Sequence, residues 1–81
     1  MLRIATRTKL TPEQTIKKAI DFFGPNGYKL KVTEQTNDSV SFEGSGGSIG
    51  ITACTDKGKT SVEFLSQEFD FQVKEFIKTI R

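Results

Sequence analysis

Apolar residues occupy every second position in five short segments of this chain, and mostly polar residues fill the positions between them. These segments are Leu2–Thr8, Tyr28–Glu34, Ser39–Glu43, Ile49–Cys54 and Ser61–Leu65. Alternation of this kind is typical of strands with one buried face, because successive side chains of a strand point to opposite sides of the sheet. The pattern therefore predicts a five-stranded sheet with one apolar face and one open, polar face.

The segment after the first predicted strand has the periodicity of an amphipathic helix. Thr11 is expected to cap this helix, Pro12 suits its first position, and Gln14 stands where a capping box requires it. The helix is predicted to run to about Phe23. Its apolar stripe consists of Ile16, Ala19, Ile20 and Phe23.

A second amphipathic helix is predicted to end near Ile80. Its apolar stripe consists of Phe69, Val73, Phe76, Ile77 and Ile80. Its start is open, because either Ser66 or Asp70 could serve as the cap. A start at Gln67 would point Phe71 away from the stripe, whereas a cap at Asp70 would leave Phe69 in the connection and let Phe71 turn inward.

The predicted order of elements is β-α-β-β-β-β-α in a single domain, residues 1–81. Short loops between the last four strands indicate an antiparallel meander. Both helices must cover the same face of the sheet, because only one set of alternate positions is apolar. Leu2–Thr8 is expected to pair beside Ser61–Leu65. The fold class is thus an α+β two-layer sandwich. By its order of elements it resembles one half of the TATA-box-binding protein fold and, more distantly, the helix-grip fold of small lipid-binding domains.

Composition limits the compartment and the size of the core. Apolar residues make up 35% of the chain and seven of them are Phe, which suits one core layer between a sheet and its helices. One Cys cannot form an intrachain disulfide framework, so a reducing compartment is favoured. The chain shows neither a signal-peptide pattern nor an apolar run long enough to span a membrane. We therefore expect a cytoplasmic protein without a membrane partner.

The residues that usually carry catalysis or bind metals are scarce. The chain has no His, so the commonest general acid–base near neutral pH is missing. Cys54 has no His partner, and the glycine-rich segment Gly44–Ser48 lacks the spacing of a phosphate-binding loop. No metal-ligand spacing is present. We therefore predict no catalytic, cofactor-binding or metal residues, and no enzyme activity.

The open face offers the candidate contact residues. By alternation, the side chains of Arg3, Arg7, Lys29, Lys31 and Thr52 should all lie there. A basic, hydroxyl-rich face could contact a nucleic-acid backbone, an acidic protein or a second copy of the chain. Basic residues on edge strands also have a plainer role, because they discourage aggregation between sheet edges.

Leu65 and Phe71 break the apolar patterns of their segments, so they could form a small apolar contact patch at a strand–helix junction. Single exposed apolar residues are also normal in proteins. The leading hypothesis is accordingly a small non-catalytic interaction module that uses its open sheet face or this junction.

The alternative is a binder of small apolar ligands, with a slot between the second helix and the sheet. The residues that would line this slot are Phe42, Ile51, Phe64, Phe69 and Phe76. The plainer interpretation is that these side chains simply fill the core, because protein interiors are close-packed. An enzyme is a third hypothesis.

Overall fold

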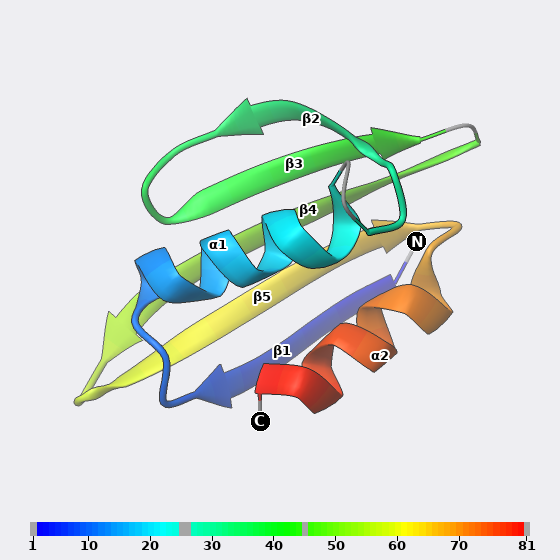
Figure 1. Ribbon diagram of the computed structural model, residues 1–81. Coiled ribbons are helices and arrows are strands. Elements are labelled where there is room, and N and C mark those ends of the chain that lie inside the picture. Colours follow the sequence, from blue (N-terminus) through cyan, green and yellow to red (C-terminus); the bar gives the residue numbers. More distant parts are fainter. Residues whose placement is uncertain (1, 25–26, 45, 81) are drawn as a thin grey trace.

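The computed structural model describes residues 2–24, 27–44 and 46–80. Within them the chain forms a five-stranded sheet and two helices, so the predicted α+β fold is confirmed (Figure 1). In chain order the elements are β1 (Leu2–Thr8), α1 (Pro12–Phe23), β2 (Lys31–Gln35), β3 (Ser39–Gly44), β4 (Gly47–Asp56), β5 (Lys59–Gln67) and α2 (Asp70–Ile80).

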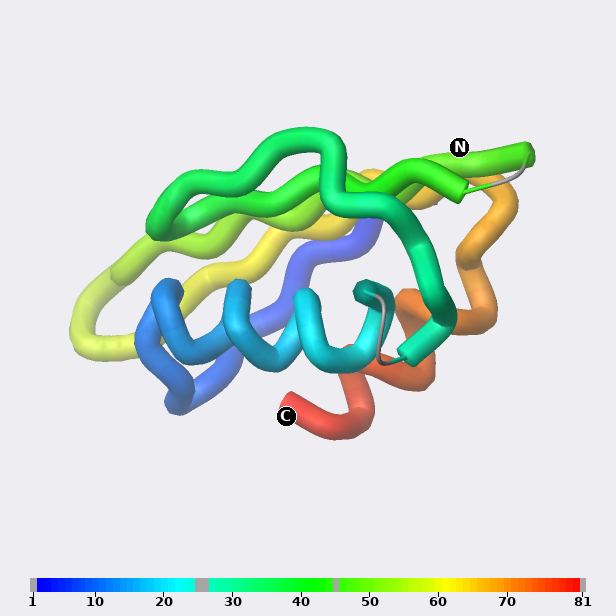
Figure 2. The backbone as a smooth tube through the Cα atoms, turned by 45° about the horizontal axis from the view of Figure 1, so that its top comes forward, coloured from blue at the N-terminus to red at the C-terminus, as the bar shows by residue number. Residues whose placement is uncertain are grey.

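The sheet is antiparallel throughout, with strand order β1-β5-β4-β3-β2. The expected pairing of the first strand with the fifth is therefore correct. α1 crosses the sheet to connect its two edges, and both helices lie on one side of it (Figures 1 and 2). The molecule thus has two layers, as the single set of apolar alternate positions required.

The core lies between these layers and is built from the predicted apolar positions. Its largest fully buried side chains are Phe23, Phe42, Phe64 and Phe76. The ring centroids of Phe23 and Phe76 are 5.3 Å apart, and those of Phe64 and Phe76 are 5.9 Å apart. These are ordinary distances for aromatic pairs, which add stability beyond the area they bury.

The start of α1 matches its sequence signals. The Thr11 side chain accepts a hydrogen bond from the Gln14 backbone N–H at 3.1 Å, and the Gln14 side chain accepts one from the Thr11 N–H at 3.1 Å. This reciprocal capping box satisfies N–H groups that have no partner inside the helix. The turn between β4 and β5 is a tight hairpin. Lys57 and Gly58 both have positive φ, 51° and 82°, which suits a tight two-residue hairpin.

The start of α2 excludes Ser66 as the cap and makes Asp70 the first residue of the helix. Ser66 is still part of β5, where it pairs with Leu2 and with Ile49, so a helix beginning at Gln67 is wrong. The backbone carbonyl of Phe69 accepts the hydrogen bond from Val73 that opens the helix. Phe69 thus lies in the connection. Phe71 does not turn inward, because 66% of it is exposed.

The segment from residue 27 to 30 differs most from the prediction. Its residues from Tyr28 onward were expected to begin the second strand, but backbone N–H groups of Tyr28, Lys29 and Leu30 donate to carbonyls at the end of α1. These hydrogen bonds hold the segment against the helix, so β2 begins only at Lys31. Leu30 is buried as predicted, whereas 45% of Tyr28 is exposed.

Candidate functional site

The side of the sheet turned away from both helices is called the open face below. The register places on it side chains from every strand: Arg3, Ala5 and Arg7 of β1, Lys31 and Glu34 of β2, Ser39, Ser41 and Glu43 of β3, Ser48, Thr52, Cys54 and Asp56 of β4, and Lys59, Ser61, Glu63, Leu65 and Gln67 of β5. Most of these residues are exposed, so within the described residues neither helix covers this face.

Four of the five predicted contact residues lie on the open face, namely Arg3, Arg7, Lys31 and Thr52. The prediction for Lys29 is wrong. Lys29 lies outside the sheet, with a φ of 63°, and its N–H donates to the carbonyl of Gly24 at 2.9 Å. The alternation rule failed here because it assumes a strand, and residues 27–30 follow the end of α1 instead.

The cations of the open face stand beside carboxylates. Arg3 lies 3.4 Å from Glu63, and Arg7 lies 3.3 Å from Asp56. Lys31 is the cross-strand neighbour of Glu43. These ion pairs are exposed and contribute little to stability. Positive and negative side chains therefore alternate across the open face, and it lacks the continuous positive strip that a phosphate backbone requires.

The centre of the open face has a depression beside a protruding apolar side chain. Gly50 of β4 pairs directly with Leu65 of β5, and 39% of Leu65 is exposed. Polar residues around them, including Thr33 and Ser41, help to line a hollow of about 260 Å³. Alternation alone did not mark Gly50 as a contact position. The available signal was a glycine inside a strand pattern, which often marks a close approach of another chain or group.

Leu65 and Phe71 do not share one patch. Leu65 projects from the open face, as does its neighbour Arg3 on β1. Phe71 belongs to α2, which covers the other face of the sheet (Figure 2). The expected junction patch therefore separates into two single exposed side chains, of which only Leu65 belongs to the open face.

The slot proposed for apolar ligands is filled by its own side chains. Phe42, Ile51, Phe64 and Phe76 are each no more than 1% exposed, and Phe76 contacts the ring of Phe64. Phe69 packs over the β3–β4 hairpin, where its ring comes close to Gly44 and Gly47. Four of the five residues form core and Phe69 is packed against it, which agrees with the plainer of the two interpretations.

Metal and membrane features can be stated for the part of the chain that the structure describes. Residues 2–24, 27–44 and 46–80 contain no group of three or more His, Cys, Asp or Glu side chains that could hold a metal ion. Neither α1 nor α2 is long and apolar enough to cross a membrane.

No family model matches this sequence, and a comparison with curated proteins gives no match either. Among solved structures, the chain is similar to the one described as the solution structure of the Aha1 dimer from Colwellia psychrerythraea. The TM-score is 0.55 and the sequence identity 19%, and the similarity covers 96% of this chain and 87% of that chain. At this level of identity the likeness supports the α+β fold and carries no residue-level assignment.

Proposed function

We propose that this chain is a non-catalytic interaction module that binds a second copy of itself through the open face. The single observation that carries the proposal is the unequal size of side chains on the two central strands. On the open face β5 presents Leu65 and Glu63, and their direct neighbours on β4 are Gly50 and Thr52. One strand thus forms a ridge and the adjacent strand a groove.

A ridge beside a groove is self-complementary under a two-fold axis. If the axis runs along the strands midway between β4 and β5, each β5 faces the β4 of the second copy. Leu65 would then enter the hollow over Gly50 of the second copy, and the reverse contact would form at the same time. Isologous interfaces of closed dimers require such reciprocal contacts, and aligned sheets pack face to face in this manner.

The neighbouring positions are compatible with the same arrangement. Glu63 would face Thr52 of the second copy, whose hydroxyl can donate a hydrogen bond to the carboxylate. Glu63 would keep Arg3 as its ion-pair partner, so its charge would not be buried alone. These contacts are polar, which points to a reversible dimer rather than an obligate one.

The area of the open face is consistent with a reversible dimer. Strand spacing and rise give the five-stranded face a projected area of about 600 Å², and stable interfaces bury about 800 Å² of accessible surface per partner. Side-chain relief raises accessible area above projected area, so a dimer would need nearly the whole face. The solved structure with a similar fold is itself described as a dimer, which is in keeping with the proposal.

Sedimentation velocity over a range of protein concentrations tests this proposal. The wild type is expected to show a concentration-dependent dimer. Leu65→Ser removes the protruding apolar side chain, and Gly50→Thr fills the hollow with a residue that favours strands. A Cβ on Gly50 would have its nearest neighbour at 3.9 Å, so the monomer should accept the change. Each variant should weaken dimerisation at least tenfold.

Phe71→Ser is the matched control, because it removes an exposed apolar side chain from the helical layer. This variant should dimerise like the wild type. The proposal is wrong if the wild type stays monomeric at all concentrations. It is also wrong if Phe71→Ser abolishes the dimer while Leu65→Ser does not. Binding of an oligonucleotide by a monomeric wild type would assign the face to nucleic acid instead.

A further inference from the structure

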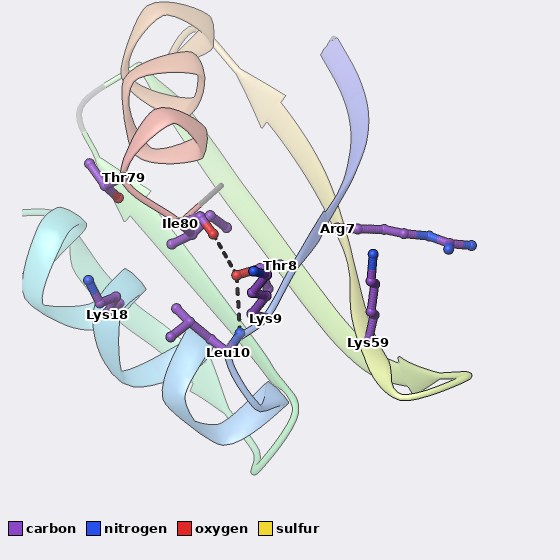
Figure 3. A pocket seen from close by; sticks show the side chains of 8 residues that line it. All are labelled: Arg7, Thr8, Lys9, Leu10, Lys18, Lys59, Thr79 and Ile80. Carbon is purple, nitrogen blue, oxygen red and sulfur yellow. Dashed lines mark hydrogen bonds between the residues drawn. The ribbon is translucent and has the colours of Figure 1, made fainter.

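A second surface feature lies at the end of the sheet, where β1 leads into α1. A pocket of about 470 Å³ opens there, between the end of β1, the connection to α1, the first residue of β5 and the end of α2 (Figure 3). This volume falls in the range of small-molecule sites, about 300–1,000 Å³. The pocket is separate from the hollow at Gly50.

The lining of this pocket is strongly cationic. Four basic residues line it, Arg7, Lys9, Lys18 and Lys59, and no Asp or Glu is among the lining residues. The Arg7 side chain extends from the other side of β1, away from Lys18 (Figure 3). The four residues come from three segments of the chain, because Arg7 and Lys9 are neighbours at the end of β1 while Lys18 lies in α1 and Lys59 in β5. In a chain whose net charge is only +2, this is a marked local excess of positive charge.

Part of this charge stands beside one carboxylate, because Asp56 is the cross-strand neighbour of Lys59. Arg7 forms an exposed ion pair with Asp56 at 3.3 Å. Residues 2–24, 27–44 and 46–80 contain no salt bridge that involves Lys9, Lys18 or Lys59. Grouping like charges in this way costs stability unless an anion is bound, because their mutual repulsion is only partly opposed.

Two hydroxyls that line the pocket donate to backbone carbonyls of α2. The hydroxyl of Thr8 donates to the carbonyl of Ile80 at 2.6 Å, and that of Thr79 donates to the carbonyl of Phe76 at 2.7 Å. The last carbonyl of α2 is thereby hydrogen-bonded. Leu10 and Ile80 add apolar surface to the same pocket, which can contact an organic group.

We propose that this pocket binds a small organic anion that carries two or more phosphoryl groups. Several cations around one cavity suit several anionic groups better than one, because a single phosphate would contact only some of them. Arg presents a fork that matches phosphate oxygens, and Lys contributes a compact charge. No aromatic side chain lines the pocket for base stacking, which disfavours single-stranded nucleic acid.

A plainer role for the same cations is to balance the negative end of the α2 dipole. The two roles differ in what they predict. Dipole balance changes the stability of the free protein and leaves no saturable response to anions. A binding site gives a thermal shift that saturates with ligand, because ligand binding to the folded state raises its stability.

The test is a thermal-shift and calorimetric titration with pyrophosphate and inorganic triphosphate, at constant ionic strength set with NaCl. The wild type should bind both probes saturably and more tightly than orthophosphate. The double variant Lys18→Gln/Lys59→Gln removes one cation from the helical layer and one from the sheet. Its affinity for pyrophosphate should fall at least tenfold.

The matched control is Lys17→Gln/Lys57→Gln, which removes the same charge from neighbouring positions that do not line the pocket. This control should bind pyrophosphate like the wild type. The proposal is overturned if pyrophosphate gives the wild type no saturable shift, or if NaCl alone reproduces the shift. An equal loss of affinity in both double variants also overturns it, because the effect would then come from overall charge.

Discussion

Phe76 and Phe71 lie on the same helix in opposite surroundings, and replacing each in turn with Leu tests how α2 sits on the sheet. Phe76 is 1% exposed and its ring contacts those of Phe22, Phe23 and Phe64, with centroids 5.3 to 5.9 Å apart. Phe71 is 66% exposed. The same chemical change is therefore made once in the core and once at the surface.

The expected size of the effect follows from these contacts. Truncating a buried Phe to Ala costs about 3–5 kcal/mol, and an 81-residue chain has a total stability of only about 4–12 kcal/mol. Phe76→Ala would thus come close to unfolding the protein. Phe76→Leu keeps much of the volume and loses three aromatic contacts, each worth about 0.5–1.5 kcal/mol and not additive. We expect a loss of about 2 kcal/mol.

Urea unfolding followed by far-UV circular dichroism measures this loss, because the chain has no Trp for fluorescence. A loss of about 2 kcal/mol corresponds to a fall in Tm of about 8–16 °C for a domain of this size. Phe71→Leu should change the free energy of unfolding by less than about 0.5 kcal/mol, as is usual for surface changes.

An effect of Phe71→Leu equal to or larger than that of Phe76→Leu would contradict the placement of α2 described above. If Phe71→Leu destabilised the protein as much as Phe76→Leu, α2 would present another side to the sheet. The comparison therefore tests the element whose start the sequence left open.

Three further substitutions test local packing, each measured by urea unfolding. The buried hydroxyl of Ser66 has no hydrogen-bond partner among the described residues, so Ser66→Ala should be neutral or stabilising by up to about 1 kcal/mol, and a clear loss would indicate a missed partner. A Cβ on Gly44 would lie 2.5 Å from Leu30 and 3.0 Å from Phe69, so Gly44→Ala should cost about 1–3 kcal/mol. The control Gly50→Ala should leave the free energy of unfolding unchanged. Equal losses in Gly44→Ala and Gly50→Ala would contradict the close contacts of Gly44. Thr11→Ala removes the capping box of α1 and should cost about 1 kcal/mol, whereas Thr11→Gly should cost less; equal losses would point to another cause.

Much of the fold could be predicted because it follows from local periodicity. Residues two apart on a strand share a face, and residues three or four apart on a helix share a stripe, wherever the element lies. For this reason the apolar positions Val40, Phe64 and Val73 were assigned to the core correctly. The capping box at Thr11 was equally accessible, because its partners are three residues apart.

The candidate site could be predicted only in part. Alternation placed Arg3, Arg7, Lys31 and Thr52 on the open face, and this needs no knowledge of strand partners. It could not show that the cations stand beside carboxylates on other strands. It also grouped Leu65 with Phe71, because closeness along the chain does not reveal that a sheet lies between two side chains.

The sequence alone thus indicated most of the apolar core and placed both helices on one side of the sheet, but it wrongly counted Tyr28 among the buried residues. Only the tertiary structure decided that Lys29 is held outside the sheet, that Gly50 is the neighbour of Leu65, and that Lys18 and Lys59 line one pocket. The physical reason is the range of the interactions. Burial on a face depends on spacing within one element, whereas register, hydrogen bonds between elements and clusters of charge depend on residues far apart in the chain.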